Sequence, residues 1–354
     1  MHRAGQSKWL AFQVGCTYVG TVVGAGFASG QEIFQFFGRY GNWGFLSILL
    51  SVVLFAWLGY KVMYLGHRLQ AHSYRELNAF LFGRTLGSVF DVVLVLMLFG
   101  VTVAMLAGAG ALFRESLHVS FQVGALLTLA ITYITIVRGI KGILEANTVI
   151  VPTMVSFVLF AAFDVLRKYG LPHIWSAGAM LTTHHPLVSL ISGVMYAAFN
   201  IGLAAGVLIP LGANVKDVET LRLGACMGAI ALGSMLLAVT CALFAHYPKV
   251  MTLDIPMAYV ASQIGRYLQW AFLFVLWGEI YSTLVGNVYS LGAQFGMRTH
   301  RSSAIVTGVI LVLAYLGSQV GFSTMVTYVY GVFSWISTLF VFALVWPREK
   351  LPVP

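Results

Sequence analysis

The chain has 354 residues, of which 59% are hydrophobic and only 9% are charged, whereas an ordinary soluble domain has roughly 25% charged residues. Most of the chain must therefore lie where charge is costly, which excludes a soluble enzyme and indicates a membrane protein. The formal net charge of +9 does not predict nucleic-acid binding, because the basic residues are scattered through short loops and form no single patch.

Apolar segments of about 20 residues predict a single all-α membrane domain with about ten transmembrane helices. The expected spans are 9–37, 44–66, 86–112, 120–138, 144–166, 187–212, 221–246, 267–296, 303–319 and 323–346. A cytoplasmic N-terminus puts most loop Lys and Arg residues on the cytoplasmic side, as the positive-inside rule requires. We therefore expect an integral protein of the bacterial cytoplasmic (inner) membrane with both termini in the cytoplasm.

The first span carries a glycine cluster in the sequence VGTVVGAGFASGQE, with glycines at positions 20, 24, 26 and 30. Each glycine costs about 1 kcal/mol in a helix relative to alanine, so we expect the helix to break at mid-membrane. Unwound backbone is tolerated there only where it lines a cavity. The alternative is close helix packing, because Gly20 with Gly24 and Gly26 with Gly30 have the Gly-x-x-x-Gly spacing.

Three connecting segments carry local signals. Ser73 and Glu76 form a capping-box pattern that predicts a short interfacial helix over 72–83. The external loop 169–186 contains two adjacent histidines, which do not readily face one metal ion from regular structure, so we interpret it as a loop without a metal. The second external loop, 247–265, has an Asp-x-Pro sequence at 254–256 that predicts the start of a short helix lying over the membrane.

The sixth span has a second group of helix-weakening residues, Asn200, Gly202, Gly206 and Pro210, which predicts a second break. Two breaks five spans apart point to an inverted repeat with a binding site at the midplane. The repeats would be 9–168 and 187–346. Free N–H groups at such breaks suit a carboxylate and free carbonyls suit a cation, so a zwitterionic solute is expected.

The eighth span places an ionisable residue, Glu279, at mid-membrane, where such residues are functional by default. Ser282 and Thr283 follow it at i+3 and i+4, so one carboxylate and two hydroxyls share a helical face. Hard oxygen ligands of this kind suit a small hard cation. The alternative is that Glu279 pairs with a polar neighbour such as Asn147 or Asn287.

Glu32 begins the segment after the first break, where its charge would favour the positive end of a helix dipole. It could instead form an outer gate or hold a substrate amine. Tyr315, Tyr328 and Tyr330 are interpreted as interfacial or packing residues, with a place along the solute path as the alternative.

On these features the chain resembles the amino-acid, polyamine and organocation transporter superfamily, which has the LeuT-type five-plus-five fold. The stretch GTVVGAGFASGQEIFQFF, residues 20–37, looks like the YkvI-type membrane proteins within it. The resemblance implies that amides of the first break contact a substrate carboxylate and that the sixth-span break holds the amine end and closes an aromatic gate. The implied substrate-binding residues are Gly24, Ala25, Gly26, Phe27, Tyr196, Phe199, Asn200 and Gly202.

The same resemblance implies a sodium site between first-span carbonyls, here those of Gly20 and Val23, and the eighth-span hydroxyls of Ser282 and Thr283. Glu279 departs from the family pattern, which often has a small residue there. A carboxylate at this position could ligate sodium or carry a proton. No cofactor and no metal is expected beyond Na+ or H+ as a coupling ion.

The sequence thus predicts an ion-coupled secondary transporter, a Na+ or H+ symporter that moves a small amino-acid- or amine-like solute by alternating access. It carries neither the metalloprotease and hydrolase motifs HExxH and GxSxG nor the nucleotide motif GxxxxGK[ST], so we expect no enzyme and no direct use of ATP. The alternative is a non-transporting channel or sensor that keeps the fold. The expected partners are a small-molecule solute and the lipid bilayer, with no nucleic acid.

Overall fold

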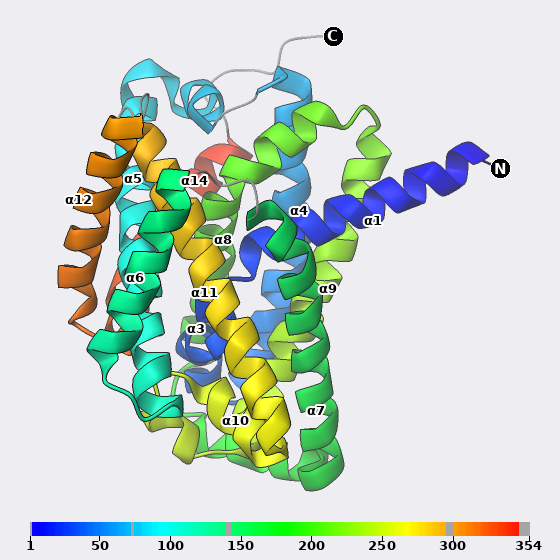
Figure 1. Ribbon diagram of the computed structural model, residues 1–354. Coiled ribbons are helices and arrows are strands. Elements are labelled where there is room, and N and C mark those ends of the chain that lie inside the picture. The colour runs from blue at the N-terminus through cyan, green and yellow to red at the C-terminus, as the bar shows by residue number, and fades with distance from the viewer. Residues whose placement is uncertain (1, 72–73, 139–142, 295–299, 347–354) are drawn as a thin grey trace.

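A computed structural model describes residues 2–71, 74–138, 143–294 and 300–346, and these form a bundle of helices joined by short connections (Figure 1). The helices of the first half are α1 (His2–Val22), α2 (Ala25–Ser29), α3 (Gln31–Phe36), η1 (Gly38–Tyr40), α4 (Trp43–Leu69), α5 (Tyr74–Ser116), α6 (Phe121–Arg138) and α7 (Ile143–Leu181). Those of the second half are α8 (Pro186–Asn214), α9 (Val218–Ala245), η2 (Lys249–Thr252), α10 (Pro256–Ile264), α11 (Arg266–Gln294), α12 (His300–Ser318), α13 (Phe322–Met325), η3 (Val326–Tyr330) and α14 (Gly331–Val345).

Within the described ranges, 6 helical segments are long and apolar enough to cross a membrane. They are Trp43–Leu69, Thr85–Ser116, Pro186–Asn214, Val218–Ala245, Arg266–Gly292 and Phe322–Val345. The segments Phe121–Val137 and Ala304–Ser318 are apolar but shorter. These segments confirm an α-helical membrane protein, and the total of ten spans stays a prediction.

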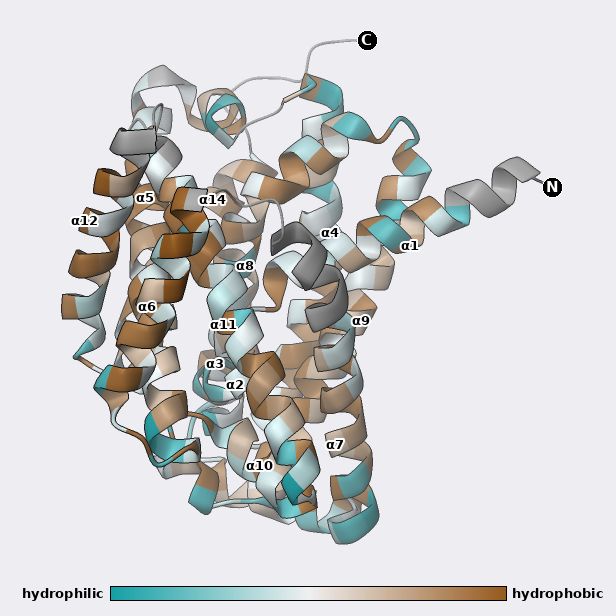
Figure 2. Ribbon diagram, viewed as in Figure 1, coloured by the Kyte–Doolittle hydropathy of each residue, from teal (hydrophilic) through white to brown (hydrophobic). Residues whose placement is uncertain are grey.

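The outer surfaces of the bundle are apolar where lipid would contact them. On α4, the exposed side chains of Leu46, Leu49, Val53 and Trp57 follow one another at helical spacing along one face. Figure 2 shows hydrophobic residues along the outer helices α6 and α12 and hydrophilic residues near the ends of the bundle. A water-soluble protein would bury such faces, so lipid is the solvent that fits them.

Helix α8 lies at the centre of the bundle and packs against α1, α4, α5 and α14. It approaches α4 backbone to backbone. A Cβ at Gly66 would overlap the backbone of Ile209, and a Cβ at Gly212 would overlap that of Met63. The close approach of these two helices therefore depends on the two glycines.

The predicted break in the sixth span is wrong, because α8 is helical without interruption from Pro186 to Asn214. The Asn200 Nδ2 donates to the carbonyl of Tyr196, one turn earlier, so this amide stays within the helix. Gly202 gives α14 room to approach, since a Cβ there would lie 3.1 Å from the Ser337 Oγ. Gly202 and Gly212 of this span serve packing, and only one helix of the predicted pair is broken.

The segment 169–186 also differs from the expected loop. Gly170 has a left-handed φ of 73°, which redirects the chain, and α7 then continues as a helix to Leu181. A similar redirection occurs in α5 at Gly83, where φ is 76°. Glycine is the residue that adopts this conformation at little cost, so each kink is encoded locally.

Two further predictions concern short helices. The predicted helix after Asp254 is confirmed as α10, with Pro256 at its start. The helix predicted over 72–83 corresponds to the part of α5 before the Gly83 kink. The capping box itself cannot be assessed, because Ser73 lies outside the described residues.

Candidate functional site

The predicted break in the first span is confirmed and has two parts. Helix α1 ends at Val22, Gly24 is extended with φ −125° and ψ −173°, and α2 begins at Ala25. A second change of direction follows at Gly30, where φ is 81°, between α2 and α3. The last carbonyls of α1 therefore accept no hydrogen bond from a following helical turn. Backbone groups of this kind are tolerated in a membrane only inside the protein or beside a cavity.

The predicted face of α11 reaches this break through Thr283. A Cβ built on Gly24 would lie 3.8 Å from the Thr283 Oγ1, and both residues are partly accessible. Gly20, one turn earlier in α1, is partly accessible as well, whereas Val23 is buried. Ser282 is buried, and its hydroxyl donates to the Glu279 carbonyl of its own helix at 3.2 Å. Thr283 is thus the hydroxyl that lies nearer the break.

Glu279 is only 2% exposed, and its Oε1 has no hydrogen-bond partner among the described residues. The Nδ2 of Asn287 is buried and equally without a partner in the described part of the chain. The alternative pairing of Glu279 with Asn287 is therefore wrong, and the side chain of Asn147 lies outside the described residues. A buried carboxylate oxygen without a partner is costly, so this position is suited to a proton or a cation.

Glu32 is also buried, at 5% exposure, and it does not cap α3. The N-cap of that helix is Gly30, and no side chain caps it. The Glu32 carboxylate instead turns back over α2, where a Cβ on Gly26 would collide with its Oε2. On the other side the Asn200 Nδ2 lies 3.5 Å from the Glu32 Oε1. Glu32 lies in the first turn of α3, where the dipole interpretation expects it, and its carboxylate also bridges the broken helix and α8.

Two tyrosines lie near the Glu32 carboxylate. Tyr330 is one of them, and Tyr196 directs its buried hydroxyl toward Glu32 and Asn200 while its ring packs against Phe36, Phe37 and Phe55. A Cβ on Gly26 would lie 3.3 Å from the Tyr330 ring. Phe199 packs on Tyr330 with ring centroids 4.7 Å apart. Of the substrate residues predicted on α8, Tyr196, Phe199 and Asn200 meet here, whereas Gly202 faces α14.

Helix α10 covers the broken helix from one end of the bundle, which we call the α10 end. A Cβ on Gly30 would lie 2.8 Å from the Met257 side chain, which is fully buried. The covering helix therefore contacts the joint between α2 and α3 directly.

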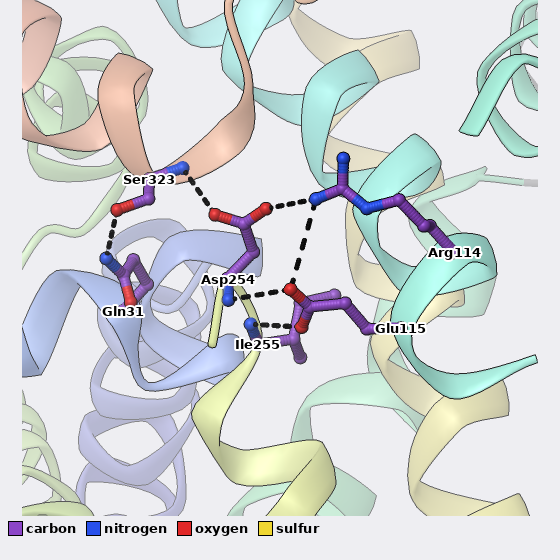
Figure 3. Close-up of polar contacts among 6 residues, drawn as sticks. All are labelled: Gln31, Arg114, Glu115, Asp254, Ile255 and Ser323. Atoms are coloured by element: carbon purple, nitrogen blue, oxygen red, sulfur yellow. Dashed lines mark hydrogen bonds and ion pairs between the residues drawn. The ribbon is translucent and has the colours of Figure 1, made fainter. Parts of the chain in front are cut away.

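A chain of polar contacts holds α10 in this position (Figure 3). The Arg114 guanidinium contacts the Asp254 Oδ2 at 2.7 Å, and the Ser323 backbone N–H donates to the Asp254 Oδ1 at 3.2 Å. The Gln31 Nε2 donates to the Ser323 Oγ at 2.7 Å. The Glu115 carboxylate accepts the backbone N–H groups of Asp254 and Ile255 at 3.0 and 3.2 Å. We call these six residues the clamp, and they join α3, α5, α13 and the start of α10.

Comparison with known proteins gives the context of this site. No family model matches the chain. The uncharacterised membrane protein YkvI of Bacillus subtilis (strain 168) is 37% identical over 350 residues, which cover 96% of each chain. The chain belongs to the YkvI family. The protein YyaD of the same organism is 25% identical over 346 residues, 98% of this chain and 97% of that one.

Solved transporter structures have the same fold at low sequence identity. MhsT in complex with L-phenylalanine has a TM-score of 0.68 and 16% identity, with 93% of this chain and 87% of that chain covered. A Na+-coupled sialic acid symporter has a TM-score of 0.60 and 12% identity, over 94% and 78% of the two chains. A manganese transporter of Eremococcus coleocola has a TM-score of 0.63 and 13% identity, over 95% and 78%. The YkvI-family chain therefore has the LeuT-type transporter fold.

Several residues of the site carry no sequence signal that would have assigned them to it. For Tyr330 the sequence leaves open an interfacial or packing role and a place along the solute path, and its position beside Glu32 depends on the η3 segment. Arg114, Glu115 and Ser323 gave no signal, because a charged pair at a span end ordinarily faces water or headgroups. Asp254 gave only a helix-start signal, although its carboxylate contacts Arg114 instead of capping α10.

Proposed function

We propose that this YkvI-family membrane protein is an ion-coupled secondary transporter that moves a small amino-acid- or amine-like solute by alternating access. The observation that carries the proposal is the broken first span, with a buried carboxylate on one side and the polar face of α11 on the other. Transporter folds of this type bind solute and coupling ion at such interruptions. The fold shared with MhsT and with the sialic acid symporter supports this class.

The proposed solute site lies between α2 and α8. It comprises the backbone from Gly24 to Phe27 together with the side chains of Glu32, Tyr196, Phe199 and Asn200. The carboxylate and the amide supply directional polar contacts, and the rings supply apolar surface, which is the composition typical of small-molecule sites.

The proposed coupling-ion site lies on the α11 side of the break. The carbonyls of Gly20 and Val23, with the Thr283 hydroxyl, would supply neutral oxygen ligands. Glu279 would supply a negative charge that either contacts sodium or takes up a proton. The Ser282 hydroxyl donates its proton to the Glu279 carbonyl and keeps its oxygen lone pairs for the ion. Neutral and charged oxygens together suit a hard monovalent cation.

The two ends of the site differ in a way that fits alternating access. The α10 end is covered by Met257 and held by the clamp, whereas Gly20, Gly24 and Thr283 are partly exposed. A site closed at one end corresponds to one of the states that such a transporter must adopt. With the predicted topology, the closed α10 end would be the external one.

The test is uptake by purified protein in proteoliposomes, with radiolabelled amino acids and amines, under an inward sodium gradient, an inward proton gradient or neither. Accumulation above equilibrium that disappears with the gradient supports a coupled transporter. Downhill flux alone would favour the channel, and ligand binding without flux would favour the sensor. Candidate solutes come from a thermal-shift screen in sodium and in potassium, since ligand at a hundredfold excess over Kd stabilises by about 2.7 kcal/mol.

A further inference from the structure

The position of the Glu32 carboxylate restricts the chemistry of the solute. Its Oε2 lies against Gly26, at the centre of the short helix α2, and its Oε1 faces Asn200 on α8. The Glu32 carboxylate therefore occupies the part of the site in which the carboxylate of a zwitterionic solute is expected to bind.

The charge of this carboxylate is not balanced by a basic side chain. None of the ion pairs found in the described residues includes Glu32. The buried polar residues of the described chain include Glu32 and Glu279 but no Lys, Arg or His. Hydrogen bonds compensate a buried carboxylate only in part, so a bound cation or a proton would stabilise Glu32 further.

The side chains near Glu32 favour an organic cation over a metal ion in this role. The Tyr330 ring lies beside the carboxylate with Phe199 packed on it, and Tyr196 adds a hydroxyl directed at Glu32. Aromatic faces attract ammonium groups through the ring quadrupole. A hard divalent metal ion needs about six oxygen ligands, and one carboxylate among rings is a poor source of them.

We propose that the solute is an organic ammonium ion that has no carboxylate of its own, with its positive end against Glu32, the Tyr196 hydroxyl and the rings of Phe199 and Tyr330. This inference rests on the proposed function and narrows its amino-acid- or amine-like solute to amines. A solute carboxylate at the Gly26 backbone would meet the charge of Glu32 at contact distance, and like charges at that distance repel. The Glu32 carboxylate attracts an amine that has no carboxylate of its own.

The experiment compares pairs of related compounds in which only the second member carries a carboxylate. Phenethylamine is tested against phenylalanine, cadaverine against lysine, and choline against glycine betaine, by calorimetry and by competition in the proteoliposome assay. We expect at least one amine to bind about 100-fold more tightly than its carboxylated partner, which is the size of one lost charged contact plus repulsion. Tighter or equal binding of the carboxylated member in every pair that binds would overturn the inference and leave the proposed transporter intact. Binding of neither class in sodium, potassium or at low pH would overturn both.

Variants then assign the effect to Glu32. The isosteric Glu32→Gln should weaken binding of the preferred amine about 10- to 100-fold and reduce the discrimination between pair members, because the charge is removed with little change of shape. The control is Glu219→Gln, which neutralises a surface carboxylate that is 60% exposed and paired with Arg222. Unchanged discrimination in a folded Glu32→Gln protein would overturn the assignment.

A second variant covers the case in which Glu32→Gln does not fold. Phe199→Leu keeps an apolar side chain but removes a ring, and it should weaken binding of choline more than that of a primary amine, which can still donate hydrogen bonds to Glu32. Equal effects on both ligands would argue against an aromatic ammonium site.

Discussion

Two sets of contacts at opposite ends of the molecule differ in kind. At the α10 end, charged and polar side chains of the clamp join segments far apart in sequence, from Gln31 to Ser323. Toward the opposite end, α4 and α8 approach each other closely at Gly66 and Gly212. The start of α1 leaves the bundle there, with Trp9 62% exposed (Figure 1).

The difference between the ends separates fixed contacts from breakable ones. Backbone-to-backbone packing at glycines is lost only when the helices themselves separate, whereas a polar clamp with a half-exposed guanidinium can exchange its bonds for water at small cost. We infer that the clamp is the part of the α10 end that opens, and that α4 and α8 move as one body. The following experiments test this comparison, from the largest expected effect to the smallest.

Glu279 lies one helical turn nearer the α10 end than Thr283 and so stands between the closed and the accessible halves. Glu279→Gln should abolish coupled uptake or change its pH dependence, because the amide can neither carry the negative charge nor exchange a proton at this depth. Uptake is measured in proteoliposomes at two pH values, with Glu219→Gln as the control. Wild-type uptake with unchanged dependence on sodium and pH would remove Glu279 from the ion site.

Asp254→Ala should open the α10 end by removing the contacts to Arg114 and Ser323. The closed state should lose about 1–2 kcal/mol of stability. The lost bond to Arg114 is charged, which raises this value, but Arg114 is half exposed, which lowers it. Two cysteine reporters detect this opening by their reaction with a maleimide that does not cross membranes. Each reporter is placed in a background in which the three native cysteines are replaced by serine. The rate of labelling of Ser29→Cys, which is buried under α10, should rise about 5- to 30-fold, as a loss of about 1–2 kcal/mol from the closed state implies. The rate of labelling of Thr21→Cys should fall.

The same labelling experiment includes a control variant and defines the result that would contradict the prediction. Glu219→Ala removes a surface pair with Arg222 far from the clamp and should leave both reporters unchanged, because exposed pairs contribute little. Rates that change at neither reporter in Asp254→Ala would mean that the clamp does not hold the closed state.

The two hydroxyls of α11 should differ in their effect on sodium dependence. Thr283→Ala removes the group that faces the break and should weaken sodium activation about tenfold, a loss of roughly 1.4 kcal/mol. Ser282→Ala alone should have a smaller effect, because Thr283 is the hydroxyl found beside Gly24 at the break, and the double variant should resemble Thr283→Ala. Thr283→Ser, which keeps the hydroxyl, is the matched control. A larger effect of Ser282→Ala would reverse the assignment.

The smallest effect tests whether α8 is continuous. Gly206 is exposed on this helix and a Cβ there would meet no atom within 4 Å, so Gly206→Ala should stabilise the protein by about 0.5–1 kcal/mol through helix propensity. Gly202→Ala should give less or none, because its Cβ would crowd Ser337. Thermal unfolding in detergent measures both. Destabilisation by Gly206→Ala would mean that α8 bends at this position during function.

Sequence reasoning succeeded where the signal is local. The glycines at 24 and 30 predicted the break, and the Asp-x-Pro sequence predicted α10, because backbone conformation at glycine and proline is set mainly by the residue itself. The same reasoning failed for α8, which stays continuous because it packs on α14 at Gly202 and on α4 at Gly212, although Gly206 is exposed. Helix propensity is a weak guide once tertiary packing contributes.

By itself the sequence thus determined the membrane environment, the broken first span and the acidic residues available to the site. Only the tertiary structure decided what those acids face: Glu32 meets Asn200 across 168 positions of sequence, and Arg114 meets Asp254 across 140. The physical reason is that composition and local propensity depend on each residue's own interaction with solvent and with its own backbone. A buried charge acts through whichever side chains the packing of distant helices brings beside it.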